Sequence, residues 1–437
     1  MISQQKPRAT GAIGILTAFM LLHQADRFLV APLTTPIMET FGIGEDLMGL
    51  TATAAIAVSI ALLPLWGYFG DRLSRPYVIA AASSIWGVTT AASAMAPSYR
   101  YFLVARASTG IDDGAYPAVR SLVADYVSPG KRALAYGVLS ATAPLGYLLA
   151  VVLALALRKQ LGWRGLYLLT GAAGILVAIV IAVRLREIRR GAADALALGV
   201  HQQKGQVARE LPTDPDPVNQ FSWAEVGKLV RRPTFLILVA QGFFGVFPWN
   251  VIAFWFFRYL EVERRLSELA ILTVMTTAIL AMSAGNLIGG WIGDAADSRV
   301  PAGRIAVSMT AVLSGSALLW ATLSVPHEKL VLFVWMTALT AFVIPIAGPN
   351  VLATLMEICP PEIRSTASAV QSFMEGSGAS FAPLVAGVVA VRSSLETAIG
   401  VVSIVAWLVC GLLFGLAFFT LAKDRQAVRE QLLARLE

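Results

Sequence analysis

Charged and titratable side chains stand inside segments of this sequence that otherwise read as hydrocarbon. Residues 22–32 are LHQADRFLVAP, in which His23, Asp26 and Arg27 share a helical face because they are three and four residues apart. A charge at the centre of a membrane-spanning helix costs about 2.5 to 3.5 kcal/mol, so one that persists usually has a partner, water or a task. A carboxyl in a poorly hydrated cavity can exchange a proton near working pH, and an arginine can hold an anion. This stretch therefore predicts proton and anion chemistry.

A second set of charges occupies residues 101–126. Arg106, Asp113 and Arg120 are seven residues apart, which in an α-helix places them on one stripe, about 10 Å apart along the axis. Asp112 is expected to point about 100° away from that stripe. Charges facing lipid would be costly, so we expect the stripe to face a cavity or a neighbouring helix.

The predicted roles divide the side chains into two groups. The candidates for proton coupling are Asp26, Asp113 and Glu375. The candidates for substrate binding are Arg27, Arg120, Trp249, Asn250 and Asn350. The alternative is structural, because static ion pairs also shift the titration of their members, and the pairs considered are Asp26–Arg27 and Arg106–Asp113. For Trp249, which stands among several aromatic residues, a packing or lipid-contacting role is the stronger alternative. For His23 the alternative is a polar residue satisfied by its surroundings.

Composition places the chain in a membrane. Of its 437 residues, 57% are hydrophobic and 14% are charged, whereas soluble domains carry roughly a quarter charged residues. Apolar runs long enough to cross a hydrocarbon layer of about 30 Å recur along the whole chain. The two cysteines, Cys359 and Cys410, offer no disulfide framework or zinc spacing. The net charge of +7 is interpreted as a topology signal and not as evidence of nucleic-acid binding.

Hydropathy predicts an all-α integral membrane protein of twelve transmembrane helices in two pseudo-symmetric six-helix bundles. Proline, glycine and charged residues mark the ends of the spans. The predicted divisions are an N-terminal bundle over 1–185, a cytoplasmic linker over 186–232 and a C-terminal bundle over 233–437. The spans are expected near 11–36, 47–69, 76–96, 101–126, 132–157, 163–185, 233–259, 267–293, 303–324, 329–355, 364–391 and 394–422.

The linker and the loops predict an orientation. Ser222 and Glu225 form a capping box, so residues 221–232 are expected to make a short interfacial helix. Most of the 34 lysines and arginines fall on the linker side of the spans, which predicts that both termini are cytoplasmic. The first span is too long for a signal peptide and is expected to be retained in a cell (inner) membrane.

Two short echoes indicate an internal duplication. GYFGD (67–71) returns as GWIGD (290–294), and DYVSPGKR (125–132) returns as EICPPEIR (357–364). Transporters are commonly built from repeats of this kind. We therefore expect the two halves of the chain to share one architecture.

The repeat also relates the charged positions of the two halves. The offset between the GYFGD copies places Trp249 opposite Asp26, and Asn250 opposite Arg27. Equivalent positions are therefore charged in the first half and neutral in the second. Glu375, in the middle of a predicted span, is the main charged exception in the second half.

The second repeated motif, DYVSPGKR and EICPPEIR, predicts contacts at helix ends. Its two copies begin with Asp125 and Glu357, and each acid is followed seven residues later by an arginine, Arg132 or Arg364. We expect these acids to make gate or helix-end ion pairs with the arginines and not to bind substrate.

The loop after the second span reads GYFGDRLSRPY and resembles the loop signature of the major facilitator superfamily. In that signature a glycine, an aspartate four residues later and basic residues close a tight cytoplasmic turn. Its positions in the two halves are Gly67, Asp71, Arg72, Arg75, Gly290 and Asp294. We interpret them as a charge clamp that makes and breaks ion pairs as the halves move. A basic loop that only sets topology is the alternative.

The resemblance narrows with the pair Asp26-Arg27, with Arg106 and Gly110 in the fourth span, and with TGIDDGAY around Asp113. Together these residues resemble the spinster-type branch, which moves lysolipids, sphingosine-1-phosphate and related amphiphiles. That branch has an Asp-Arg pair in span 1 and an acid in span 4, for which Asp113 would be the counterpart. Anion symporters share several of these features and are the second choice.

The expected function is secondary active transport by alternating access. The partners would be a small organic anion or amphiphile, protons and the lipid bilayer, with a monomer expected and no cofactor or metal. The sequence contains no P-loop, HExxH or GxSxG motif, so nothing nominates an enzyme. The alternatives are a proton-driven exporter of the multidrug type, and a lipid scramblase or sensor that keeps the transporter fold.

Overall fold

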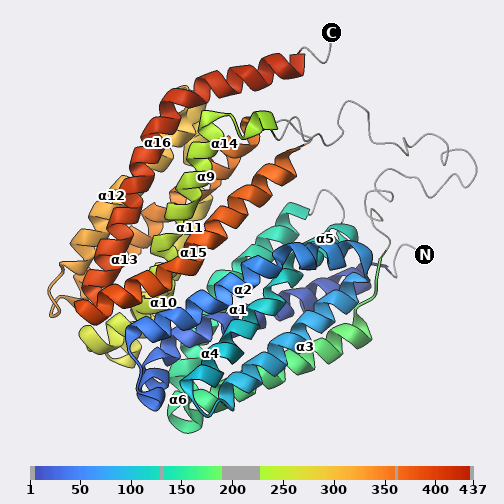
Figure 1. The fold of residues 1–437 in the computed structure, drawn as a ribbon, viewed down its shortest axis with the longest axis vertical. Coiled ribbons are helices and arrows are strands. Elements are labelled where there is room, and N and C mark those ends of the chain that lie inside the picture. Colours follow the sequence, from blue (N-terminus) through green and yellow to red (C-terminus); the bar gives the residue numbers. More distant parts are fainter. Residues whose placement is uncertain (1–4, 128–131, 189–226, 360–362, 434–437) are drawn as a thin grey trace, which may run out of the picture. The chain divides into compact units, whose positions relative to one another are not determined.

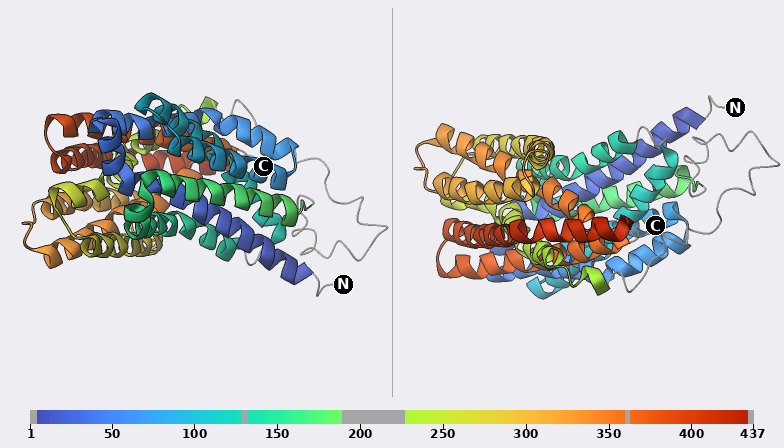
Figure 2. Two further views of the ribbon diagram at one scale, coloured as in Figure 1. Left: turned by 90° about the horizontal axis from the view of Figure 1, so that it is seen from below. Right: turned by 90° about the horizontal axis from the view of Figure 1, so that it is seen from above.

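The computed structural model describes residues 5–127, 132–188, 227–359 and 363–433. Across these residues the regular structure is helical, which confirms the predicted all-α membrane architecture. The chain divides into two compact units, Met1–Leu211 and Pro212–Glu437, and in each unit long helices run side by side (Figures 1 and 2). Helices suit this setting because each one bonds its backbone polar groups internally, where lipid offers them no partner.

The first unit is a bundle in which α1 and α3 both pack against the long α6. Its elements are α1 (Gln5–Phe41), α2 (Glu45–Arg72), α3 (Arg75–Ala94), α4 (Tyr99–Ser108), the 3₁₀ helix η2 (Thr109–Ala115), α5 (Tyr116–Tyr126) and α6 (Arg132–Arg184).

The second unit repeats this plan, with α9 and α12 both packing against the long α16. Its elements are α9 (Pro233–Gly245), α10 (Phe247–Arg258), the π-helix η7 (Tyr259–Glu263), α11 (Glu268–Asp297), α12 (Gly303–Leu323), α13 (Leu330–Val343), the 3₁₀ helix η8 (Ile344–Ile346), α14 (Ala347–Glu357), α15 (Arg364–Arg392) and α16 (Leu395–Leu433).

Among the described residues, 10 helices are long and apolar enough to cross a membrane. One of them, Val138–Arg184, belongs to the long helix α6, which corresponds to two predicted spans, 132–157 and 163–185. Gly162, at φ 65° and ψ 177°, breaks the helix between them. The predicted span 101–126 is not among the ten and is made of three shorter segments, α4, η2 and α5. Each predicted span therefore has a helical counterpart.

The predicted linker 186–232 falls mostly outside the described residues. The structure describes 186–188 and 227–232, and of these 227–229 are helical. The interfacial helix predicted over 221–232, with its capping box at Ser222 and Glu225, therefore stays a prediction.

An apolar cluster forms the core of the first unit beside the charged part of α1. Its members include Leu16 and Phe19 of α1, Trp86 of α3 and Leu122 of α5, all nearly fully buried. The rings of Phe19 and Trp86 meet edge to face with centroids 6.4 Å apart. Aromatic pairs of this geometry hold their helices in a defined register, so the polar side chains of the next turn of α1 are held in place.

A ridge of small residues lets α11 approach the backbone of α13, η8 and α14. A Cβ atom at Gly285 would lie 2.0 Å from the carbonyl oxygen of Phe342, and one at Gly289 would lie 2.6 Å from the Cα of Ile346. Contacts this close between backbones are what small residues at membrane helix interfaces allow.

Gly285→Ala is expected to destabilise the second unit, because the new methyl group meets a backbone oxygen that cannot rotate away. Overpacking of this kind costs about 1–3 kcal/mol. Thermal unfolding of the purified protein in detergent measures the effect. Gly290→Ala is the control on the same helix, since its Cβ would find its nearest neighbour, the Cβ of Pro349, at 3.9 Å. Equal melting temperatures for the two variants would contradict this packing.

Candidate functional site

A partly exposed charge pair of the first unit joins α1 to η2. Arg27 donates from Nη1 to Oδ1 of Asp113 over 3.2 Å. The side chain of Arg27 is 40% exposed and that of Asp113 is 12% exposed. The guanidinium is therefore available to a second anion while Asp113 holds it in position.

Asp26, the neighbour of Arg27 in sequence, is enclosed by other helices. Its Oδ1 accepts a hydrogen bond from Thr170 of α6 over 2.6 Å, and its Oδ2 accepts one from Thr90 of α3 over 2.9 Å. Arg106 of α4 places Nη1 3.9 Å from Oδ2. Asp26 is buried, and two hydroxyl groups and one cation compensate its charge.

The structure corrects the ion pairs considered from the sequence. Asp26–Arg27 and Arg106–Asp113 are not the pairs that form; instead Arg27 holds Asp113, and Arg106 lies nearest to Asp26. Adjacent residues on a helix point about 100° apart, so Asp26 and Arg27 face different neighbours.

The continuous stripe predicted for span 4 is also corrected. The span changes to a 3₁₀ helix over Thr109–Ala115, which winds more tightly than an α-helix and rotates the later residues. Arg106 is buried against α1 and α6, Asp113 reaches Arg27, and Arg120 is exposed. Arg120 and Asp113 therefore do not share one environment with Arg106.

Sequence reasoning missed a buried polar cluster on the same two segments. His23 lies between Tyr116 and Asp112, with Nδ1 2.6 Å from the Tyr116 hydroxyl and Nε2 3.1 Å from Oδ2 of Asp112. The signal was present in the sequence: His23 stands one turn before Arg27 on α1, and Asp112 stands beside Asp113 on η2. The adjacent acids Asp112 and Asp113 thus contact His23 and Arg27, which lie one turn apart on α1.

Three of these side chains could in principle donate to a metal ion. One ligand atom each from His23, Asp112 and Asp113 lie within 4.8 Å of one another. Arg27 already engages Asp113, and Tyr116 already engages the other ring nitrogen of His23. A guanidinium in contact with one donor disfavours a cation there, so this donor set carries no metal assignment.

Two candidates of the second unit, Glu375 and Asn350, are already hydrogen-bonded. Glu375 is half-buried on α15 and accepts a 2.9 Å hydrogen bond from Gln371, one turn earlier. Asn350 is buried and donates to the carbonyl oxygens of Gly289 and Ile346, so its amide joins α14 to α11. This placement favours a packing role for Asn350.

Trp249 and Asn250 both lie near the start of α10. Trp249 is 39% exposed. The Asn250 amide donates to the carbonyl oxygen of Val246, one turn earlier on the chain. The indole face is therefore free to meet lipid or substrate, while the asparagine is partly occupied by its own helix.

Arg75 is the centre of the clamp in the first unit. It begins α3, is buried, and binds Asp125 over 2.5 Å and Glu187 over 2.6 Å. It also donates to the Ser121 hydroxyl over 3.0 Å and to the carbonyl oxygen of Ile188 over 2.6 Å. The side-chain surroundings of the other predicted members, Gly67, Asp71 and Arg72, lie outside what the structure describes.

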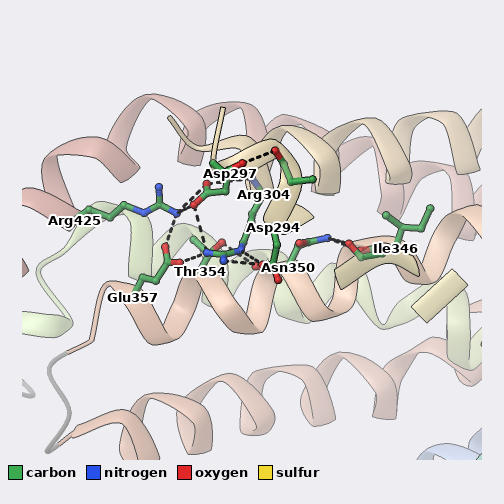
Figure 3. A network of polar contacts seen from close by, with 11 residues as sticks. Asp294, Asp297, Arg304, Ile346, Asn350, Thr354, Glu357 and Arg425 are labelled. Carbon is green, nitrogen blue, oxygen red and sulfur yellow. Dashed lines mark hydrogen bonds and ion pairs between the residues drawn. The ribbon is translucent and has the colours of Figure 1, made fainter. Parts of the chain in front are cut away.

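A matching network closes the corresponding end of the second unit (Figure 3). Arg304, the second residue of α12, donates to Asp294 over 2.8 Å and to Asp297 over 3.4 Å, and it pairs with Glu357. Arg425 of α16 bridges Asp297 and Glu357 from the other side. Asp294, a predicted clamp residue, is therefore paired, and Gly290 lies one turn before it on α11.

The two networks share one design. In each unit an arginine at the start of the third long helix reaches an acid at the end of the fourth span, Arg75 to Asp125 and Arg304 to Glu357. The predicted partners of these acids, Arg132 and Arg364, have side chains outside the described part of the chain. Arg304 was missed because more residues separate it from Asp294 than separate Arg75 from Asp71.

Comparison with known families shows which family the chain belongs to. The model of the Major Facilitator Superfamily matches residues 16–383 of the chain, which is most of its length. The chain belongs to the major facilitator superfamily. It is a multi-pass membrane protein, and the family to which it belongs consists of transporters and not of enzymes.

Its curated relatives include both spinster proteins and exporters. Protein spinster homolog 1 of Bos taurus is 28% identical over 249 residues, covering 56% of this chain. The match spans 44% of that relative, so the chain corresponds to less than half of its length. An MFS-type efflux pump of Mycolicibacterium smegmatis is 25% identical over 395 residues, covering 87% of this chain and 84% of the pump.

A solved structure shares the fold over almost the whole chain. It is the crystal structure of a bacterial homologue of the human lysosomal transporter spinster, in an inward-facing and unoccupied conformation. The TM-score is 0.80 at 20% sequence identity, and the match covers 96% of this chain and 99% of that one. The predicted spinster-like resemblance is therefore confirmed for relatives and for fold.

Proposed function

We propose that this protein is a proton-coupled transporter of an anionic amphiphile such as a lysolipid, working by alternating access. We further propose that it lies in the cytoplasmic membrane as a monomer with both termini cytoplasmic. The excess of lysines and arginines near the linker supports this orientation. The similarity to the sphingosine-1-phosphate transporter SPNS2 of Danio rerio, which is 27% identical over 188 residues, supports an amphiphilic cargo.

The contact between Arg27 and Asp113 carries the proposal. The distance of 3.2 Å is longer than the usual 2.7–2.9 Å of a charge-assisted bond, and the guanidinium is partly exposed. A phosphate or carboxylate headgroup presents several oxygens to the planar guanidinium and can displace a single carboxylate oxygen. The anionic group of the substrate and Asp113 thus compete for one cation.

Proton coupling is assigned first to Asp26 and Asp113, and second to Glu375 in the other unit. Protonation of Asp113 would release Arg27 for substrate, and protonation of Asp26 would release Arg106. The exposed indole of Trp249, with Asn250 beside it, is proposed to meet the apolar part of the cargo. Arg120, which is exposed, is kept as a secondary anion-binding candidate.

The test is transport in proteoliposomes that contain a pH-sensitive dye and carry an imposed pH gradient. The probe is lysophosphatidate with a fluorescent acyl chain, and extraction by albumin reports what remains in the outer leaflet. The proposal expects gradient-dependent movement of the probe with a matching change of internal pH. Movement that is independent of the gradient and leaves the internal pH unchanged would indicate a scramblase and contradict the proposal.

A second candidate is a proton-driven exporter of small drugs. The match to the mycobacterial efflux pump favours it, because that match covers 87% of this chain. The same vesicles loaded with ethidium distinguish the two functions. Gradient-driven efflux of ethidium without movement of lysophosphatidate would select the exporter.

Asp26→Asn is expected to abolish gradient-driven accumulation of the probe while leaving exchange of the probe across the membrane largely intact. The amide keeps a hydrogen-bonding group beside Thr90 and Thr170 but cannot bind and release the proton. The comparison is made in the same vesicles with and without the gradient. Unchanged dependence on the gradient would remove Asp26 from coupling.

A further inference from the structure

We propose that His23 and Asp112, with Tyr116, form a second proton-binding site that lies behind the contact between Arg27 and Asp113. As a binding site it stands on its own geometry. Its use in transport rests on the proton coupling proposed above. The pair gains one proton when an anionic substrate takes Arg27, and gives it up when the substrate leaves.

Both nitrogens of the His23 ring are engaged, although the ring is buried. Nε2 lies 3.1 Å from Asp112 Oδ2, and Nδ1 lies 2.6 Å from the hydroxyl of Tyr116. A tyrosine hydroxyl can donate to a neutral ring nitrogen or accept from a protonated one. The contacts therefore suit both protonation states of the imidazole, as a site that loads and unloads requires.

Aromatic rings make this position suitable for a cation. Phe19 stacks on the imidazole with ring centroids 5.7 Å apart and an angle of 24°. Trp86 stands perpendicular to the imidazole with centroids 5.4 Å apart. A cation within about 6 Å of an aromatic centroid is stabilised by roughly 0.5 to 2 kcal/mol. The two rings therefore stabilise a charged imidazolium among apolar side chains.

The surroundings of Asp112 also indicate a bound proton. Its Oδ1 is buried and has no hydrogen-bond partner among the described residues. A buried carboxylate with one oxygen unbonded is costly, and it is stabilised either by a charged imidazolium or by a proton of its own. A proton held by the pair, on the imidazole of His23 or on the carboxylate of Asp112, therefore avoids an uncompensated buried anion.

The site is coupled to the substrate position through two shared segments. His23 and Arg27 lie one turn apart on α1, and their partners Asp112 and Asp113 are adjacent on η2. When an anion takes Arg27 while Asp113 is still unprotonated, the Asp113 carboxylate is left without its cation close to His23. One proton taken from solvent onto the pair restores the local balance of charge.

In the described part of the chain, no other helix brings a positive charge close enough to His23 to replace this proton. Among the described residues, α3 contributes Trp86 and Thr90, and α2 and α6 carry their charged residues away from the middle of the bundle. The titratable and charged groups that face this region are Asp26 and Arg27 of α1, Arg106 of α4, Asp112 and Asp113 of η2, and Tyr116 of α5.

The first test observes the proton directly and needs no substrate. The chain has three histidines, so His201→Gln with His327→Gln leaves His23 as the only histidine of the 437-residue chain. Nitrogen-15 NMR of that ring, labelled through histidine, distinguishes the neutral from the charged form. We expect one transition with pH, displaced by more than about one pH unit in the variant that adds Asp112→Asn.

The second test asks whether transport uses this proton. His23→Gln keeps two hydrogen-bonding groups but cannot be charged, and it is expected to remove the dependence of lysophosphatidate transport on the pH gradient. His327→Gln, at an exposed position, is the matched control and is expected to leave that dependence unchanged.

Any of three results would overturn the proposal. A ring that keeps one protonation state at every pH, or a transition that Asp112→Asn does not displace, would reduce His23 to a packing residue. If His23→Gln transports with the wild-type dependence on the gradient, the site has no part in coupling. If lysophosphatidate is not transported at all, the proposed function fails while the NMR test still decides the proton site.

Discussion

Arg27→Gln is expected to lower transport of lysophosphatidate about 100-fold, mainly by weakening binding. Removing one partner of a hydrogen-bonded charge pair costs about 2–5 kcal/mol, and 1.4 kcal/mol is a factor of ten in affinity. Glutamine can still donate to Asp113 but offers the headgroup no charge. The measurement is the initial rate in proteoliposomes at several probe concentrations, together with the Kd for the detergent-solubilised protein.

The control for this effect is an arginine outside the site. Arg100, which is exposed near the start of α4, should tolerate Arg100→Gln without loss of transport. Monoacylglycerol with the same acyl chain serves as the uncharged ligand, and its Kd should not change in Arg27→Gln. Equal losses of affinity for both ligands would contradict charge recognition by Arg27.

Arg75→Gln is expected to destabilise the first unit by about 3–5 kcal/mol, the usual cost of breaking a buried ion pair by removing one partner. Asp125, which is 9% exposed, would lose its cation in the middle of the network. The carbonyl oxygen of Ile188 and the hydroxyl of Ser121 would lose donors as well. Thermal and denaturant unfolding in detergent measure the loss.

Arg304→Gln is the informative comparison for this prediction. Its side chain is more exposed than that of Arg75, and Arg425 remains to hold Asp297 and Glu357, so a smaller loss of stability is expected. A network that only set topology would leave both variants as stable as the wild type. That outcome would contradict the clamp at both positions.

Much of the architecture could be predicted because the membrane constrains the sequence strongly. Apolar length, loop charge and the repeated GYFGD and GWIGD motifs were enough to predict the helical spans and the family. Arg27 and Asp113 were both predicted as site residues because a charge in hydrocarbon demands an explanation. The division of α6 into two spans was also predicted, and the break at Gly162 lies in the interval between the predicted spans 132–157 and 163–185.

The pairing of charges could not be predicted, since it depends on local winding and on contacts between helices. In the 3₁₀ segment η2 both Asp112 and Asp113 reach α1, at His23 and Arg27, and a 3₁₀ winding was not predicted from the sequence. The enclosure of Asp26 by Thr90 and Thr170 requires knowledge of which helices are neighbours. Hydroxyl-bearing residues are too frequent in membrane helices to reveal such partners by themselves.

The most direct measurement of the central claim is the affinity of Asp113→Asn for lysophosphatidate. If Asp113 and the anionic headgroup compete for Arg27, removing the carboxylate frees the guanidinium and tightens binding, by about tenfold if roughly 1.4 kcal/mol of competition is relieved. Binding of the uncharged monoacylglycerol should stay unchanged. Weaker or unaltered binding of lysophosphatidate to Asp113→Asn would contradict the competition on which this account of transport depends.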